Sequence, residues 1–218
     1  MTTQHRKLPR GRSALPVDQV EVVQRGRVYA ALAQVLTERG YAATTVQDVI
    51  GRAGVSRQTF YRYFDSKADC FAAAYQAAGE NLLARVLDRL AATPEGESAR
   101  ADEVPPHRFE RLIDAYVQTL AADWPTARLC LVEAFAAGPG VLPVRAPLYD
   151  TVVDLVAETL GAGDAEGRRV CRMILAATTA LATSAVADTD LDQLEAAGKE
   201  LKAYARRLRE AGLLGSRP

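Results

Sequence analysis

The side chains with the clearest chemistry lie between residues 45 and 67, where hydroxyls, amides, arginines and tyrosines are closely spaced. Arginine can donate two hydrogen bonds to O6 and N7 of guanine, and glutamine can pair in a similar way with N6 and N7 of adenine. Hydroxyls, lysines and the free amides at a helix N-terminus suit phosphate oxygens. We therefore predict that this segment binds double-stranded DNA in a sequence-specific manner.

The candidate DNA contacts divide by chemistry. For base edges we expect Arg57, Gln58 and Tyr61. The expected phosphate contacts are Thr45, Arg52, Thr59, Tyr63 and Lys67. Ser56, the expected cap of the helix that begins at Arg57, completes the DNA-binding set. The alternative is an ordinary helical hairpin with a polar face.

Two short helices joined by a turn must position these side chains. Gly40 ends a preceding helix, because a residue without Cβ is favoured there. Thr45 and Asp48 have the spacing of a capping box at the start of the first short helix. Gly54 lies where the chain must turn, with positive φ expected, and Ser56 caps the second short helix. Such a short connection with a glycine is typical of a helix-turn-helix.

Residues 18–67 resemble the DNA-binding domain of the TetR family of bacterial transcriptional regulators. The matching residues are Ala31, Gly40, Tyr41, Thr44, Thr45, Val46, Ile50, Ala53, Gly54, Val55, Ser56, Thr59, Tyr61, Phe64 and Lys67. Phe60 and Tyr63 depart from the residues that the family often has at these positions. The resemblance implies a homodimer with one ligand-binding domain per subunit, in which ligand binding usually releases the operator. Arg57 and Gln58 lie at variable positions, so no operator sequence is implied.

Charge is unevenly distributed along the chain, although the formal net charge is 0. Residues 1–67 hold 11 Lys and Arg against 5 Asp and Glu, whereas the remainder holds 16 against 22. A basic end on an acidic body would direct the helix-turn-helix toward phosphates. The alternative is a solvated imbalance without functional consequence.

The first residues are basic and contain Pro9 and Pro16. We expect residues 1–17 to form a disordered arm that reaches DNA, or else an idle tail. They lack the apolar segment of a signal peptide, and no run of 18 apolar residues occurs, so we expect a cytoplasmic protein without a membrane partner.

No enzyme class has support in the sequence. Cys70, Cys130 and Cys171 are too scattered for a disulfide framework and are expected to be buried, with thiol sensing as the alternative. Neither a metal-ligand cluster nor a phosphate loop, nucleophile elbow or catalytic carboxylate pair is recognisable, so we expect no metal and no cofactor. The rival interpretations are a helical ligand-binding protein or enzyme that does not read DNA, and a nonspecific architectural DNA-binding protein.

The rest of the chain favours helices and shows no strand pattern, which predicts an all-α fold of about nine helices. We place the helix-turn-helix domain at residues 18–65 and a helical ligand-binding and dimerisation domain at residues 66–218. Helices are expected over about 107–122, from 124 to 137, over 147–160, over 165–187 and from Asp190 onward, with a loop at 92–106.

The last helix carries an apolar stripe that we expect at a dimer interface. Its members are Leu191, Leu194, Leu201, Ala205 and Leu208. The last two helices of the chain, paired with their twofold copies, would form a four-helix bundle. The alternative is that the stripe packs inside one subunit.

The body also contains apolar side chains that could line a ligand cavity. The candidates are Phe109, Tyr116, Trp124, Phe135, Tyr149 and Met173. Few charges fall within the apolar stripes, which favours a small, neutral, lipophilic effector, with Arg111 or Glu133 as a polar anchor. The combined interpretation is a repressor that an effector releases from a near-palindromic operator.

Overall fold

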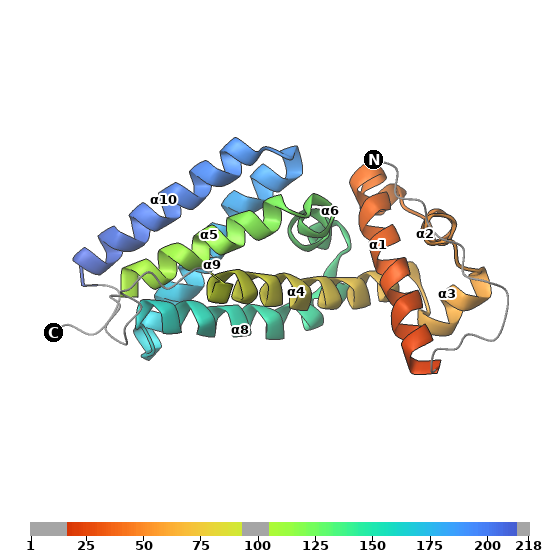
Figure 1. Ribbon diagram of the computed structural model, residues 1–218, viewed down its shortest axis with the longest axis horizontal. Coiled ribbons are helices and arrows are strands. Elements are labelled where there is room, and N and C mark those ends of the chain that lie inside the picture. The colour runs from red at the N-terminus through yellow and green to blue at the C-terminus, as the bar shows by residue number, and fades with distance from the viewer. Residues whose placement is uncertain (1–16, 93–104, 213–218) are drawn as a thin grey trace.

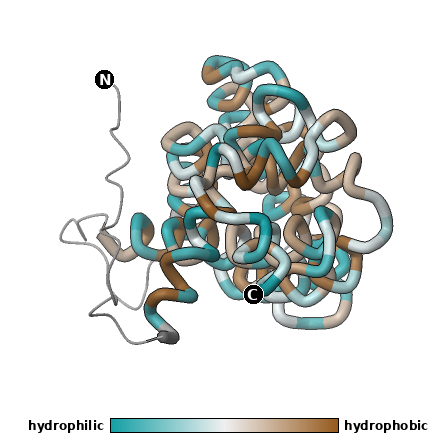
Figure 2. The backbone as a smooth tube through the Cα atoms, turned by 90° about the vertical axis from the view of Figure 1, so that its right-hand side faces the viewer, coloured by the Kyte–Doolittle hydropathy of each residue, from teal (hydrophilic) through white to brown (hydrophobic). Residues whose placement is uncertain are grey.

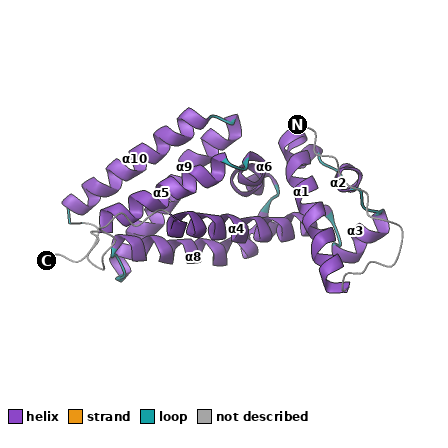
Figure 3. Cartoon of the chain, in the orientation of Figure 1, coloured by secondary structure: helices purple, strands orange, loops and turns teal. Residues whose placement is uncertain are grey.

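The computed structural model describes residues 17–92 and 105–212, and throughout these ranges the regular structure is helical, without a strand (Figure 3). The elements in chain order are α1 (Val17–Ala43), α2 (Val46–Ala53), α3 (Arg57–Tyr63), α4 (Lys67–Ala92), α5 (Pro105–Ala121), α6 (Trp124–Arg128), the π-helix η1 (Leu129–Glu133), α7 (Ala134–Ala136), the 3₁₀-helix η2 (Pro139–Val141), α8 (Leu142–Leu160), α9 (Ala165–Asp188) and α10 (Leu191–Glu210). Counted as one run, α6, η1 and α7 bring the longer helices in the described ranges to nine, so the predicted all-α class is confirmed. Residues 1–16 of the predicted arm and 93–104 of the predicted loop lie outside the described ranges.

Helices α1–α3 form one end of the molecule, and α4 leads from this end into an elongated helical body (Figure 1). The local signals that predicted these helices are present. Gly40 interrupts α1 with φ of 70°, Thr45 and Asp48 form a reciprocal capping box on α2, and Gly54 adopts the left-handed conformation with φ of 64°. The Ser56 side chain accepts a hydrogen bond from the Thr59 amide at the start of α3. These features fix the angle between α2 and α3.

A continuous apolar core supports the helix-turn-helix. Phe60 and Phe64 are 1% and 2% exposed and pack against the buried face of α1. The same cluster extends through Phe71 and Tyr75 of α4 to Leu129 of η1. The predicted domain boundary at residue 65 therefore remains a prediction, because packing continues across it.

The body consists of α4, α5, α8, α9 and α10, which lie side by side and contact one another in pairs. Hydrophilic and hydrophobic residues alternate along the helical tubes, as expected for helices that each bury one side (Figure 2). Two apolar clusters hold the body together: one centres on Phe109, Val153 and Leu160, and the other on Leu120 and Leu194.

Two helical details differ from the prediction. Helix α8 begins at Leu142 rather than at Pro147, because Pro143 occupies its first turn and the exposed Pro147 is accommodated in its interior. The helix predicted to run from 124 to 137 is interrupted by the π-helix η1. A π turn holds one extra residue, which no periodicity argument from a short segment could reveal.

Most of the stripe on α10 packs within the subunit, as in the alternative interpretation of the sequence, and its place at a dimer interface stays a prediction. Leu194, Leu201 and Ala205 are at most 8% exposed, and Leu208 packs against the cluster around Phe109. Gly198 brings α10 close to α5, where a Cβ at this position would lie 3.1 Å from Val117 Cγ2. Leu191 alone of the stripe is largely exposed. The leucine spacing indicated burial, but the buried contact is with α5.

Among the described residues, α9 is the one helix long and apolar enough to cross a membrane by length and composition alone, with 33% of its apolar window buried. Core helices of soluble proteins meet the same criterion. Its buried side packs against α8 and α10.

Candidate DNA-binding surface and internal cavity

Helix α3 presents the predicted base-reading side chains outward. Arg57 and Gln58 are exposed, and Tyr61 is 43% exposed although its neighbour Phe60 is buried. The Arg57 guanidinium lies 5.6 Å from the centroid of the Tyr61 ring, within the range of a cation–π contact. These three side chains therefore lie together on a helix that is fixed from beneath by Phe60 and Phe64.

The hydroxyl residues predicted at phosphates lie near the N-termini of α2 and α3. Thr45 Oγ1 accepts from the Asp48 amide at 3.2 Å, and Ser56 Oγ accepts from the Thr59 amide at 3.0 Å. Thr59 is half-buried beside Ser56, and Tyr63 is half-buried at the C-terminal end of α3. Capping thus uses part of the hydrogen-bonding capacity of Thr45 and Ser56 while both residues stay exposed.

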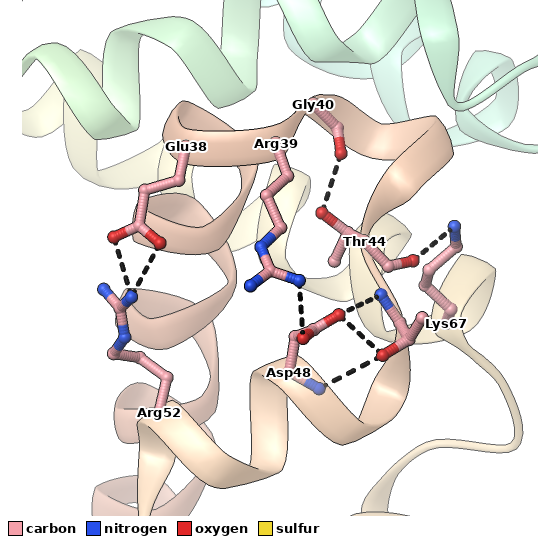
Figure 4. Close-up of polar contacts among 8 residues, drawn as sticks. Glu38, Arg39, Gly40, Thr44, Asp48, Arg52 and Lys67 are labelled. Carbon is pink, nitrogen blue, oxygen red and sulfur yellow. Dashed lines mark hydrogen bonds and ion pairs between the residues drawn. The ribbon is translucent and has the colours of Figure 1, made fainter.

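Two of the predicted phosphate contacts are engaged in contacts within the protein (Figure 4). Arg52 on α2 binds both carboxylate oxygens of Glu38 at 2.7 Å. Lys67 Nζ donates to the carbonyl oxygens of Tyr41 and Thr44 at 2.8 and 2.9 Å and lies 4.1 Å from the Tyr41 ring centroid. Lys67 therefore fastens the start of α4 to the junction between α1 and α2, and its phosphate contact stays a prediction.

Two arginines on the helix-turn-helix remain without an acidic partner in the described part of the chain. Arg57 contacts only the Tyr61 ring, and Arg62 is exposed on the same helix. Arg39, in contrast, pairs with Asp48 at 3.0 Å. A further arginine supports the turn, since Arg27 of α1 donates to the Ala53 carbonyl at 2.7 Å. Arg62 was not among the predicted contacts, although its position five residues after Arg57 placed it on an outer face.

An apolar cavity of about 150 Å³ lies in the body between α4, α5, α8 and α9, with η1 beside it. Four of the six predicted lining residues border it: Phe109, Tyr116, Phe135 and Tyr149. Further lining residues, which were not singled out from the sequence, include Leu82 and Val86 of α4, Leu112 and Ile113 of α5, and Val152 and Leu155 of α8. The cavity is narrow, so an elongated ligand would have to move its walls apart.

Trp124 and Met173 do not border the cavity, and their prediction as lining residues is corrected. Trp124 begins α6 and packs against the cluster around Leu120, whereas Met173 is 63% exposed on the outer side of α9. The suggested polar anchors are also misplaced, because neither Arg111 nor Glu133 borders the cavity. The sequence alone does not show which face of each helix borders the cavity.

Tyr75, Tyr116 and Arg145 are polar side chains among the residues that line the cavity. Tyr75 and Tyr116 border it, and within the described ranges neither hydroxyl forms a hydrogen bond with the protein. Arg145 of α8 borders both the cavity and an adjoining outer hollow, with its guanidinium 5.2 Å from the Phe135 ring centroid. Burial raises the pKa of Tyr75 to about 12, while the nearby charge of Arg145 acts in the opposite direction. Both tyrosines are therefore neutral hydrogen-bonding groups at neutral pH.

The cysteines are free thiols in an apolar environment. Burial raises the pKa of Cys70 and of Cys130 to about 12, and nearby aspartates act in the same direction. Since the thiolate is the reactive form, this environment disfavours the thiol-sensing alternative.

The outward side of α9 carries small and apolar residues. Met173, Ala177 and Leu181 are exposed at a spacing of four residues and so share one face. Tyr204 of α10 is 57% exposed. The last two helices thus present exposed apolar side chains on both α9 and α10.

Comparison with known proteins shows similarity in the segment that contains the helix-turn-helix. A family model described as "Bacterial regulatory proteins, tetR family" matches residues 28–74, which include all of α2 and α3. The transcriptional activator FasR of Mycolicibacterium smegmatis is 25% identical over 142 residues, covering 63% of this chain and 61% of FasR. An HTH-type regulator of Bacillus subtilis, YvdT, is 32% identical over 71 residues, covering 33% of this chain and 34% of that protein. Thus the similarity spans less than two thirds of either relative.

Solved structures share the fold over most of the chain. A TetR transcription regulator from Haloarcula marismortui superposes with a TM-score of 0.68 at 22% identity, covering 84% of this chain and 97% of that one. FadR from Bacillus subtilis, solved in complex with stearoyl-CoA, gives a TM-score of 0.67 at 16% identity, with 83% and 96% coverage. At such identities the likeness establishes the arrangement of helices in the body as well as in the helix-turn-helix.

Proposed function

We propose that this chain is a ligand-responsive regulator of the TetR type that reads a near-palindromic operator with α3, because residues 28–74 match the family model that covers α2 and α3. The observation that carries this proposal is the combination on one rigid helix of exposed Arg57, Gln58 and Tyr61 with a buried Phe60 and Phe64. Base-reading chemistry on a well-supported helix is what direct readout in the major groove requires.

A dimer gives this readout its symmetry. Two recognition helices about 34 Å apart can read two half-sites on one face of DNA. The exposed face of Met173, Ala177 and Leu181 on α9 supports a homodimer formed by the last two helices, because a partner subunit would remove these apolar side chains from water. Changing the spacing of the two copies of α3 would remove one set of base contacts.

The effector proposed for the cavity is small and lipophilic. The mostly apolar lining favours an aliphatic chain, and Tyr75, Tyr116 and Arg145 offer a polar end for a carboxylate or similar anionic head. This revises the neutral effector expected from the sequence. The FadR structure similar to this chain was solved with stearoyl-CoA, a ligand of the same amphipathic character, which supports the proposal.

Ligand binding is proposed to release the operator, which would make the protein a repressor. A ligand shifts the protein toward the state that it binds more tightly, and only by its difference in affinity between the two states. The relative FasR is named an activator, so transcription from the target promoter must be measured in addition to DNA binding.

The test begins with the DNA that flanks the gene of this protein, with random DNA as competitor at physiological salt. A discrete footprint with two symmetric halves, weakened by palmitate but not by hexadecylamine, is the expected result. Binding without preference over random DNA would contradict operator reading and favour an architectural DNA-binding protein. Palmitate binding without any DNA binding would favour a helical ligand-binding protein that does not read DNA.

A further inference from the structure

Glu133 is the most deeply buried charged side chain of the described residues, and it bridges two parts of the fold. It is 3% exposed and lies at the end of η1. Its Oε2 accepts a hydrogen bond from the Tyr41 amide at 2.7 Å, and its Oε1 accepts from Arg128 Nε at 3.0 Å. Burying a carboxylate is costly unless charge and hydrogen bonds compensate it, and both carboxylate oxygens are engaged here.

The Tyr41 amide belongs to the junction that sets the helix-turn-helix in place. Gly40, with φ of 70° and ψ of 168°, breaks α1 immediately before it. The Gly40 carbonyl accepts from Thr44 Oγ1 at 2.7 Å (Figure 4). The Tyr41 carbonyl accepts from Lys67 Nζ. Glu133 thus adds a hydrogen bond from the body to a junction that α1, α2 and the start of α4 also hold.

The same π turn that carries Glu133 also borders the cavity. Cys130 and Leu131 line it, and Phe135 lines it one turn later. Leu129, in contrast, is buried in the apolar core that supports Phe60 and Phe64. Arg128, which pairs with Glu133, also donates to the Ala187 carbonyl at the end of α9 at 3.1 Å. One short segment therefore contacts the cavity, the core of the DNA-binding end and the end of α9.

We propose that Glu133 is the positioning residue through which occupation of the cavity reaches the recognition helix. A ligand that widens the narrow cavity displaces Cys130 and Leu131, and Glu133 moves with them because it belongs to the same turn. Loss of its bond to the Tyr41 amide frees the junction between α1 and α2, so α3 changes its position relative to the body. Local π turns are frequent at functional sites and provide a segment with an alternative helical register. This inference rests on the proposed ligand-responsive function.

The test uses the full chain, a duplex that the protein selects from a random pool, and two measurements: affinity for that duplex and hydrogen exchange at the Tyr41 amide. Cys130→Phe enlarges a cavity-lining side chain without any ligand, and Glu133→Gln removes the charge while keeping the shape. Each variant should weaken duplex binding and accelerate Tyr41 exchange, both by roughly tenfold. The double variant should be no weaker than Glu133→Gln, since both changes act through one contact.

The matched control is Glu110→Gln, which removes a carboxylate paired with Arg206 on the opposite part of the body and should change neither measurement. Weaker duplex binding by Cys130→Phe with unchanged Tyr41 exchange, or additive effects in the double variant, would overturn the role of Glu133. If Cys130→Phe does not fold, palmitate added to the wild type replaces it, with the same expectations. Palmitate that releases the duplex while Tyr41 stays protected would refute this relay but leave the proposed function intact. A wild type that binds no selected duplex would refute the proposed function itself.

Discussion

At the scale of single residues, the arginines of the helix-turn-helix have separate tasks. Arg52 is bound to Glu38, whereas Arg57 extends from α3 with only the Tyr61 ring beside it. Arg57→Ala should therefore weaken binding to the selected duplex by about 1–3 kcal/mol and relax the preference at one base position. Competition titrations with single-base variants of the duplex measure this. Arg62→Ala is the control and should weaken all duplexes alike; an equal loss on specific and random DNA for Arg57→Ala would contradict base reading.

For Lys67 we predict an effect on stability rather than on DNA binding, since its ammonium group bonds to the protein backbone. Lys67→Met removes two charge-assisted hydrogen bonds to the Tyr41 and Thr44 carbonyls, and we expect a loss of about 1.5–3 kcal/mol in the free energy of unfolding. Urea denaturation measures this loss. The salt dependence of binding to random DNA should not change, whereas a slope lowered by about one would show that Lys67 contacts a phosphate after all.

The burial of the Cys70 thiol makes the free energy of unfolding depend on pH. Burial raises its pKa from 9.0 to about 12, so above pH 9 the unfolded chain releases a proton that the folded chain retains. The contribution of Cys70 to stability is thus full below pH 9 and declines by about 1.4 kcal/mol per pH unit between pH 9 and 12. Urea denaturation of the wild type and Cys70→Ala at several pH values should give this difference in slope. Parallel curves would contradict it.

At the scale of elements, the ends of helices were predictable and their partners were not. Thr45, Gly54 and Ser56 act on neighbours within a few residues, so their roles follow from local spacing. The contact of Glu133 with Tyr41 joins positions 92 residues apart, and no local pattern indicates it. The leucines of α10 show the same limit, because their spacing predicts a buried face but does not identify the helix that covers it.

The approach of α4 to α8 gives a prediction for the cavity. A Cβ on Gly79 would lie 2.3 Å from Leu148 Cδ2, and both residues border the cavity. Gly79→Ala should push the flexible Leu148 side chain into this space, so palmitate should bind roughly tenfold more weakly, a loss of about 1.4 kcal/mol. Calorimetric titration measures the affinity. Gly51→Ala, where a Cβ meets nothing within 4 Å, is the control; unchanged palmitate affinity in Gly79→Ala would place the ligand elsewhere.

At the scale of the whole molecule, the proposed operator reading depends on two subunits held at a fixed spacing. The distinction between buried and exposed faces of the last two helices makes this testable. Leu201→Glu should cost roughly 3–5 kcal/mol in folding, because it buries an unpaired charge against α5. Ala177→Arg, on the exposed face of α9 between Met173 and Leu181, should leave the subunit folded and separate the dimer.

Sedimentation velocity with Ala177→Arg, and with Ala92→Arg at the exposed end of α4 as control, distinguishes these cases. The Ala177 variant should sediment as a monomer with unchanged helical content and lose most of its affinity for the two-half-site duplex, because each subunit then binds one half-site without its partner. Its affinity for a single half-site should match that of the wild-type subunit. A dimer that survives Ala177→Arg would show that the interface lies on another face of the subunit. The cavity would then alter the spacing of the two copies of α3 through that other face.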